Sequence, residues 1–227
     1  MTVDLSAWTA ITGKSRPAVD SWAKLVGRWS EPHRRYHGIG HLTAVLLFVN
    51  EYADHAEDPD AVRLAAWYHD AIYDPLAVDN EERSAELAES ELAALGISSD
   101  RIAEVARLVR MTAGHEPAAR DRNGELLNDA DLLVLASPPD AYVVYLNAIR
   151  AEYAHVSDAD FRAGRAGVLD ALLAAPKLYR LAALAPLGAA ARRNMTAELS
   201  LLRAAPLGAG ADDADPPDAG QPEAPAH

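Results

Sequence analysis

The sequence contains no cysteine among its 227 residues. Disulfide bonds, zinc–thiolate clusters and thiol nucleophiles are therefore excluded, and any metal must be bound by nitrogen and oxygen donors. Long apolar runs are also missing: the stretch from Leu42 to Val49 is far shorter than the roughly 20 residues that cross a bilayer. The N-terminal MTVDLSAWTA lacks a basic segment followed by an apolar one. We therefore expect no secretory signal and a cytoplasmic protein.

Basic residues are in the minority, with 21 Lys and Arg against 34 Asp and Glu and a net charge of −13. This balance argues against broad nucleic-acid or anionic-membrane binding, which require a basic face. Five of the acids follow Arg203, which leaves 29 acidic and 21 basic residues in the rest of the chain. An anionic substrate would still need a locally positive pocket. We expect at least two of four arginines beside it, namely Arg34, Arg35, Arg150 and Arg165.

Apolar residues recur with helical spacing along most of the chain, and strand-like alternation is absent. The pattern predicts one all-α domain over residues 1–204, folded as a helical bundle. From residue 205 to residue 227 the chain is acidic, rich in Pro, Ala and Gly and without periodicity, which predicts a disordered tail. The expected helices begin with one that Pro17 opens and Glu31-Pro32 closes, and continue over about 41–54, 59–70, 79–96, 100–112, 125–136, 140–155, 157–174 and 187–204.

Two polar motifs lie at opposite ends of consecutive predicted helices. His41 begins the helix over 41–54, and the pair His69-Asp70 ends the helix over 59–70. The two helices have nearly equal lengths and a short link, which favours an antiparallel hairpin. The hairpin places the start of one helix beside the end of the other. His41, His69 and Asp70 are therefore expected to converge as metal ligands.

A fourth ligand is expected from the helix over 125–136, where two carboxylates interrupt an apolar run in the string LNDADLL. Buried carboxylates are rare unless they are paired or bound to a metal. Asp131 is followed by two leucines and is the better inward-facing candidate. Asp129 would then face about 200° away around the helix and lie at the rim of the site.

The ordered set His41, His69-Asp70 and Asp131 resembles the H…HD…D signature of the HD superfamily of metal-dependent phosphohydrolases. The resemblance covers residues 30–200. The strings WYHDAIYDP, DNEERSA, LNDADLL and AIRAEY look like a narrower bacterial branch of predicted HD hydrolases. The resemblance to the HD superfamily implies an all-α HD-domain fold, a divalent metal held by these four residues, and hydrolysis of phosphate esters, often of nucleotides. The expected substrate is a small anionic phosphorylated molecule.

The sequence departs from this family pattern in two places. Leu132 follows the last aspartate, where many relatives carry Lys or Arg, so no phosphate contact is expected from that position. Relatives with two metals carry extra histidines between the HD pair and the last aspartate, and here only His115 falls in that interval. One divalent ion is therefore expected, with Mn, Fe, Co, Ni, Mg and Zn all compatible with nitrogen and oxygen donors. Asp70 would bind the ion and relay a proton from the attacking water.

Five further residues are candidates for substrate binding or catalysis, each with a simpler structural alternative. His37 either binds a substrate phosphate or caps the entry to the following helix. Arg150 and Arg165 either clamp the phosphate or pair with Glu152 or Asp160 on a helix surface. His115 and Glu82 are candidate acid or base groups, with a loop histidine and a capping-box glutamate as the alternatives.

Two other functions are compatible with the same residues. One is a di-iron oxygenase on the same fold, which would need more metal ligands than the sequence offers. The other is a non-catalytic regulatory protein, which the complete set of four ligands disfavours.

Overall fold

The computed structural model describes residues 3–204, and every regular element within them is a helix. The all-α fold class is confirmed, while the tail expected over 205–227 lies outside the described residues. The α-helices are α1 (Leu5–Thr12), α2 (Arg16–Trp29), α3 (Ile39–Glu51), α4 (Pro59–Tyr68), α5 (Asn80–Ala94), α6 (Ser99–Met111), α7 (Arg122–Asp131), α8 (Pro139–Glu152), α9 (Asp158–Ala174) and α10 (Gly188–Arg203). Three short 3-10 helices connect them: η1 (Ala53–His55), η2 (Leu132–Ala136) and η3 (Ala182–Leu187).

The predicted boundaries agree with the observed ones to within three residues for most helices. Two differences matter. The short helix α1 was not expected, because eight residues offer little periodic pattern; it is held by the buried Trp8 and by the Asp4 side chain, which accepts the Ser6 N–H at its start. The helix expected over 125–136 changes from α to 3-10 geometry after Asp131. Asp131 is therefore the last residue of α7.

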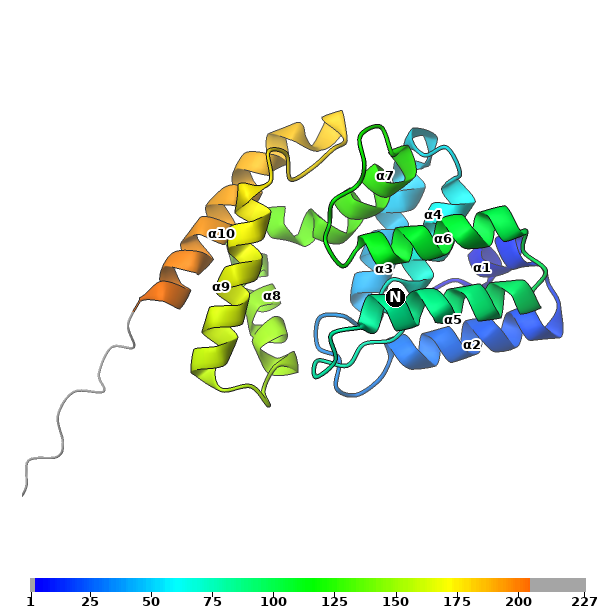
Figure 1. Ribbon diagram of the computed structural model, residues 1–227, viewed down its shortest axis with the longest axis horizontal. Coiled ribbons are helices and arrows are strands. Elements are labelled where there is room, and N and C mark those ends of the chain that lie inside the picture. The colour runs from blue at the N-terminus through cyan, green and yellow to red at the C-terminus, as the bar shows by residue number, and fades with distance from the viewer. Residues whose placement is uncertain (1–2, 205–227) are drawn as a thin grey trace, which may run out of the picture.

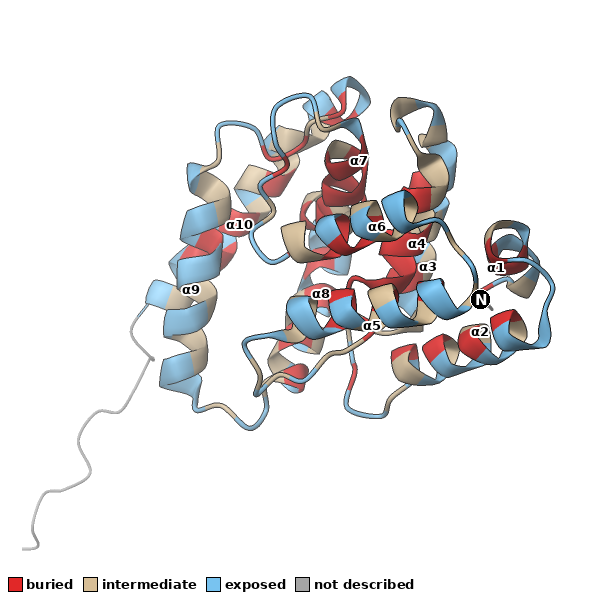
Figure 2. Cartoon of the chain, turned by 45° about the vertical axis from the view of Figure 1, so that its right-hand side comes forward, coloured by how far each residue is buried: buried red, intermediate tan, exposed pale blue. Residues whose placement is uncertain are grey.

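Helix α4 lies at the centre of the molecule and is packed by α3, α5, α6 and α7. Pro59 opens it, and the Asp58 side chain accepts the Ala61 N–H at its first turn. Seven of its ten residues are buried, and Figure 2 shows the buried helices α4 and α7 inside a more exposed outer layer. His69 and Asp70 directly follow this most buried helix, so its packing fixes their position.

Two tryptophans attach α1 and α2 to α4. The Trp8 indole N–H donates to the carbonyl oxygen of Ala18 (2.8 Å), and the Trp8 ring packs edge-on against Trp67. The Trp29 indole N–H donates to the carbonyl oxygen of Trp67 (2.9 Å). Both rings are fully buried, so their polar atoms are satisfied without water.

Helices α8, α9 and α10 lie together on one side of the α1–α7 body, to the left in Figure 1. Helix α10 packs against α9 and η2, so η2 connects this group to α7. A second connection comes from the buried Asp129, whose carboxylate accepts the backbone N–H groups of Arg180 and Leu181 at 2.7 to 2.9 Å. The expectation that Asp129 lies at the rim is therefore wrong: it anchors the segment between α9 and η3 to α7.

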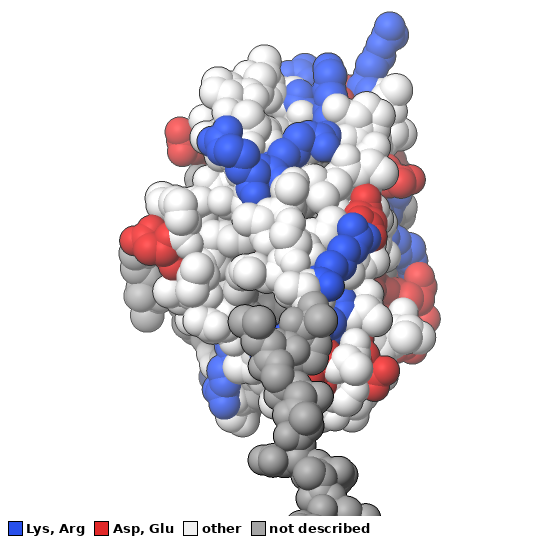
Figure 3. All heavy atoms as spheres, turned by 90° about the vertical axis from the view of Figure 1, so that its left-hand side faces the viewer, with Lys and Arg blue, Asp and Glu red and all other residues white. Residues whose placement is uncertain are grey.

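The surface combines local clusters of charge with uncharged areas. Figure 3 looks at the side on which α9 and α10 lie, and lysine and arginine side chains gather in the upper part of this face. The net charge of −13 therefore does not prevent local positive clusters. No single helix among residues 3–204 has the length and apolarity needed to cross a membrane; Arg122–Ala136 and Pro139–Glu152 reach that threshold only as a pair, across a bend of 106°.

Candidate metal centre

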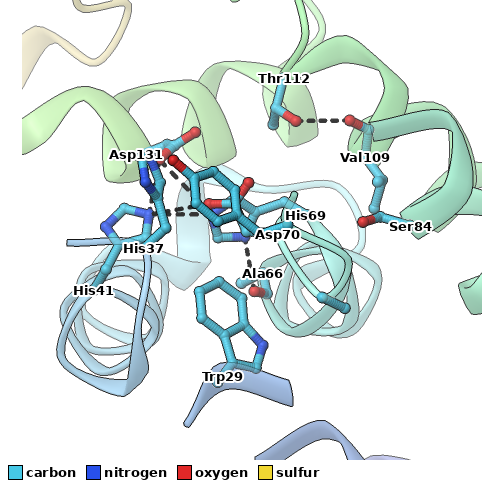
Figure 4. Close-up of polar contacts among 12 residues, drawn as sticks. Trp29, His37, His41, Ala66, His69, Asp70, Ser84, Val109, Thr112 and Asp131 are labelled. Atoms are coloured by element: carbon cyan, nitrogen blue, oxygen red, sulfur yellow. Dashed lines mark hydrogen bonds and ion pairs between the residues drawn. The ribbon is translucent and has the colours of Figure 1, made fainter. Parts of the chain in front are cut away.

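Four side chains converge where the ends of three helices meet. His41 lies in the first turn of α3, His69 and Asp70 follow α4, and Asp131 ends α7 (Figure 4). The His41 Nε2 atom lies 3.1 Å from the His69 Nε2 atom and 3.0 Å from an Asp131 carboxylate oxygen. The Asp70 carboxylate lies 3.3 Å from His69 Nε2 and 3.9 Å from His41 Nε2. The convergence expected from the sequence is thus observed.

These distances suit a single cation. Two donors that each lie about 2.1 Å from one ion are about 3.0 Å apart at a right angle and at most about 4.2 Å apart when opposite. The spacings among His41, His69 and Asp131, and those from Asp70 to the two histidines, are 3.0 to 3.9 Å and fall inside this range. His41, His69 and Asp131 could together hold a metal ion, and Asp70 lies close enough to add a fourth donor. Imidazole and carboxylate donors accept most divalent first-row ions and Mg²⁺.

The orientation of His69 is fixed by the protein. Its Nδ1 atom lies 2.9 Å from the carbonyl oxygen of Ala66, which can only accept, so Nδ1 carries the proton. When the ring is neutral, its Nε2 lone pair is therefore available on the side of His41 and the two carboxylates. The Trp29 ring packs 5.3 Å from the His69 ring on its buried side. Such a backbone hydrogen bond is typical of the outer contacts that orient metal-binding histidines.

The charges at this centre favour a bound positive ion. Burial alone would lower the pKa of His69, but Asp70 and Asp131 outweigh it and raise that pKa to about 9. Burial raises the pKa of both carboxyls, yet the neighbouring histidines hold the pKa of Asp70 and of Asp131 well below the usual range. Two ionised carboxylates in a buried site attract either protons or a metal cation.

Arg34 ties together the two segments that carry the histidines. Its buried guanidinium donates to the carbonyl oxygens of His37 (2.9 Å), Asp70 (2.7 Å) and Ala71 (3.2 Å). It also contacts a carboxylate oxygen of Glu31 at 3.1 Å, so its charge is paired. Arg34 is therefore not one of the arginines that line the pocket, because its planar N–H fork is engaged by backbone carbonyls. Its role is to hold the loops in place.

His37 is oriented by a buried carboxylate from α8. A carboxylate oxygen of Glu152 lies 2.7 Å from His37 Nδ1 and accepts the Tyr73 hydroxyl at 2.9 Å. The other oxygen of Glu152 accepts the backbone N–H groups of residues 35–37 at 2.7 to 2.9 Å. Burial would raise the pKa of Glu152, but the His37 hydrogen bond and charge and these backbone donors lower it to about 2. Glu152 belongs to the string AIRAEY, and nothing in the sequence alone linked it to His37.

A pocket of about 780 Å³ opens on this centre. Asp70, Asp131, His37 and His115 line one part of it, and Arg165 lines another. The His115 Nε2 atom lies 3.9 Å from the second carboxylate oxygen of Asp131, and its buried Nδ1 has no hydrogen-bond partner among the described residues. His115 also has a left-handed backbone (φ 52°), which is uncommon outside glycine. Strained residues of this kind concentrate at functional sites.

Glu82 does not lie in the pocket, which corrects its assignment as an acid or base. Its exposed carboxylate binds the Arg110 guanidinium at 2.6 and 2.8 Å, and Asp79 makes no side-chain cap at this helix start, so the capping-box alternative also fails. Glu81 lines the pocket instead. Successive residues on a helix point about 100° apart, so a small error in helix phase exchanges these two glutamates.

At least two of four arginines were expected beside the pocket, but Arg34, Arg35 and Arg150 do not line it. Arg150 donates to the carbonyl oxygens of Tyr153 and Val156 and to the Asp158 carboxylate, so it closes the turn after α8 and is not a phosphate clamp. The Arg34 guanidinium donates to the carbonyl oxygen of Asp70, and the Arg35 guanidinium donates to the carbonyl oxygen of Pro32. These arginines satisfy nearby backbone carbonyls, which sequence patterns do not reveal.

Arg165 does line the pocket, as expected. It is also engaged by Glu198, at 2.7 and 3.2 Å, and by the Tyr145 hydroxyl at 3.0 Å. Its partner is therefore not Asp160, the alternative considered from the sequence. A guanidinium held by one carboxylate keeps part of its fork free for a further anion.

Comparison of the chain with protein-family models, curated proteins and solved structures returns no match. Any function must therefore be argued from the site itself.

Proposed function

We propose that the protein is a metal-dependent hydrolase of phosphate esters. The observation that supports this most directly is the group His41, His69 and Asp131, spaced as in a coordination shell. Asp70 lies beside both histidines, and a pocket of about 780 Å³ opens on Asp70 and Asp131. A pocket of this size accommodates a drug-sized ligand. In this proposal His41, His69, Asp70 and Asp131 hold one divalent ion, which supplies Lewis-acid activation of a water molecule and of a phosphoryl oxygen.

The remaining pocket residues have roles set by their positions. His37 faces the pocket with its Nδ1 atom held by Glu152, which leaves Nε2 to contact a phosphoryl oxygen. Arg165 approaches from α9 and offers its unused N–H groups to the substrate. His115 lies beside Asp131 and is placed to move a proton to or from the ester oxygen that leaves.

The test is hydrolysis of p-nitrophenyl phosphate and a panel of phosphomonoesters and nucleotides by protein prepared with each divalent metal in turn. We expect phosphate release to require metal and to be lost in Asp131→Asn, together with the bound metal. The matched control is Asp100→Asn, on the exposed start of α6, which should retain both.

Absence of phosphate release with every metal and ester would overturn the proposal. Iron content with colour and oxygen consumption, without phosphate release, would instead favour the di-iron oxygenase.

A further inference from the structure

The pocket that opens on the metal centre has two chemically different parts. Its polar part is lined by Asp70 and Asp131 of the metal centre together with His37 and His115. The opposite part is built by η2, α8 and α9, and its walls are mainly aliphatic and aromatic. The apolar residues there include Leu132, Leu135, Ile149, Phe161, Val168 and Leu172. Helix α9 lies on the left in Figure 1, and its residues Phe161, Val168 and Leu172 line this part of the pocket.

The charges in the pocket do not suit a substrate with several phosphates. Among the described lining residues, Arg165 is the one with a permanent positive charge, and Glu198 already binds it. Glu81 and Asp160 add negative charge to the lining beyond the two carboxylates of the metal centre. A second or third phosphate would therefore meet carboxylates or aliphatic walls, where an anion is costly to bury.

The volume also exceeds what one phosphate needs. A phosphate at the centre occupies a small fraction of the roughly 780 Å³, so most of the pocket must receive the rest of the substrate. Covering the aliphatic walls makes the binding free energy more favourable only when the group that covers them is apolar. A sugar hydroxyl placed there would lose its water and find few partners.

We propose that the substrate is a phosphomonoester of an apolar alcohol, with one phosphate at the metal centre and an aryl or alkyl group seated between α8, α9 and η2. This rests on the proposed phosphohydrolase function and names its substrate class. Water adds to phosphorus, the ester P–O bond breaks, and the leaving oxygen takes up a proton, so the products are inorganic phosphate and the apolar alcohol.

The first test is a series of alkyl phosphates from ethyl to octyl, compared with glycerol phosphate, glucose 6-phosphate and AMP. Burial of each methylene predicts about a fourfold increase in kcat/KM until the pocket is filled. The polar esters should fall well below hexyl phosphate. A rate independent of chain length, or AMP turned over as fast as hexyl phosphate, would overturn the substrate class.

The second test measures binding without turnover. Alkylphosphonates, which cannot be hydrolysed, are titrated into the metal-loaded protein in a calorimeter. We expect the dissociation constant to fall about fourfold per methylene. Chain-length-dependent binding without hydrolysis of any ester would refute the phosphohydrolase function and retain the apolar seat. A dissociation constant that does not change with chain length would refute the apolar seat alone.

Two valines provide a matched pair of variants. Val168 on α9 lines the pocket, whereas Val143 on α8 does not, and their exposed fractions are 51% and 53%. Asparagine is similar in size to valine and uncharged, so it makes the pocket wall more polar without adding a charge that would act on the phosphate. Val168→Asn should lower the ratio of kcat/KM for hexyl phosphate to that for glycerol phosphate at least threefold. Val143→Asn should leave this ratio as in wild type, and equal effects of the two variants would contradict the assigned seat.

Discussion

Replacing Glu152 by glutamine tests how strongly the protein holds His37 and its loop. The substitution keeps the shape of the side chain and one carbonyl oxygen for the backbone donors of residues 35–37. It removes the negative charge that faces the His37 ring at 2.7 Å. Glu152 is only 5% exposed, so water cannot replace the lost interactions.

The magnitude follows from the pKa of Glu152, which is about 2 in the folded protein against an ordinary value of 4.5. Because the folded pKa is depressed, the ionised carboxylate contributes stability that is fully present above pH 4.5. That contribution is lost as the pH falls through 2. The difference of about 2.5 pKa units corresponds to about 3 kcal/mol at pH 7. The raised pKa of His37 arises from the same interaction with Glu152, so it adds nothing to this stabilisation.

The assay is urea unfolding of wild type and Glu152→Gln in chelator, at several values between pH 7 and pH 3.5. We expect the variant to be less stable by about 3 kcal/mol at pH 7, and the difference to shrink by roughly 1 kcal/mol by pH 3.5. Comparing two proteins at each pH removes the titration of groups that do not interact with Glu152 from the result.

Glu125→Gln provides the matched control. Glu125 also faces a histidine, His55, at 3.0 Å, but the pair is partly exposed and, among residues 3–204, the Glu125 carboxylate accepts no backbone N–H. This control should lose at most about 1 kcal/mol. Equal losses in the two variants, or a Glu152→Gln difference that does not depend on pH, would refute the role assigned to Glu152.

Three further predictions separate metal binding from folding. Asp131→Asn should abolish the rise in melting temperature that a bound divalent ion gives wild type, as thermal melts with and without chelator would show. Asp129→Ala leaves the N–H groups of Arg180 and Leu181 without an acceptor and should lower stability by about 2–4 kcal/mol in urea unfolding. Its metal stoichiometry should stay that of wild type, whereas a loss of metal would make Asp129 a ligand. Arg34→Lys cannot reach three carbonyls with one ammonium, so calorimetric titration should show weaker metal binding; unchanged affinity would contradict the clamp.

The sequence predicted the features that depend on local pattern. Helical periodicity and end signals located most helices, and the short link between two of equal length brought His41 next to His69 and Asp70. The choice of Asp131 followed from the cost of burying a carboxylate in an apolar run. These inferences need only neighbouring residues and elementary helix geometry.

The features that sequence reasoning missed depend on partners far apart in the chain. Glu152 contacts the loop of His37 although the two residues are 115 positions apart in the sequence, and Asp129 contacts Leu181, which is 52 positions away. Neither pairing leaves a local trace, and the segment bound by Asp129 has no periodicity of its own. The sequence pointed to Glu82, whereas Glu81 lines the pocket, and this difference has another cause: it needs only a one-residue error in the expected helix phase.

The Arg34 clamp has a consequence for which cations the centre would accept. Because the guanidinium binds the backbone carbonyl of Asp70 rather than its carboxylate, both carboxylate oxygens stay available while the loop cannot move outward. A cage that cannot expand selects ions by radius. Calcium, with bonds of about 2.3–2.6 Å and six to eight ligands, would require wider spacing and more donors than four clamped side chains provide. Ions with bonds near 2.1 Å would fit without moving the loop, so abundant calcium would compete poorly for this centre.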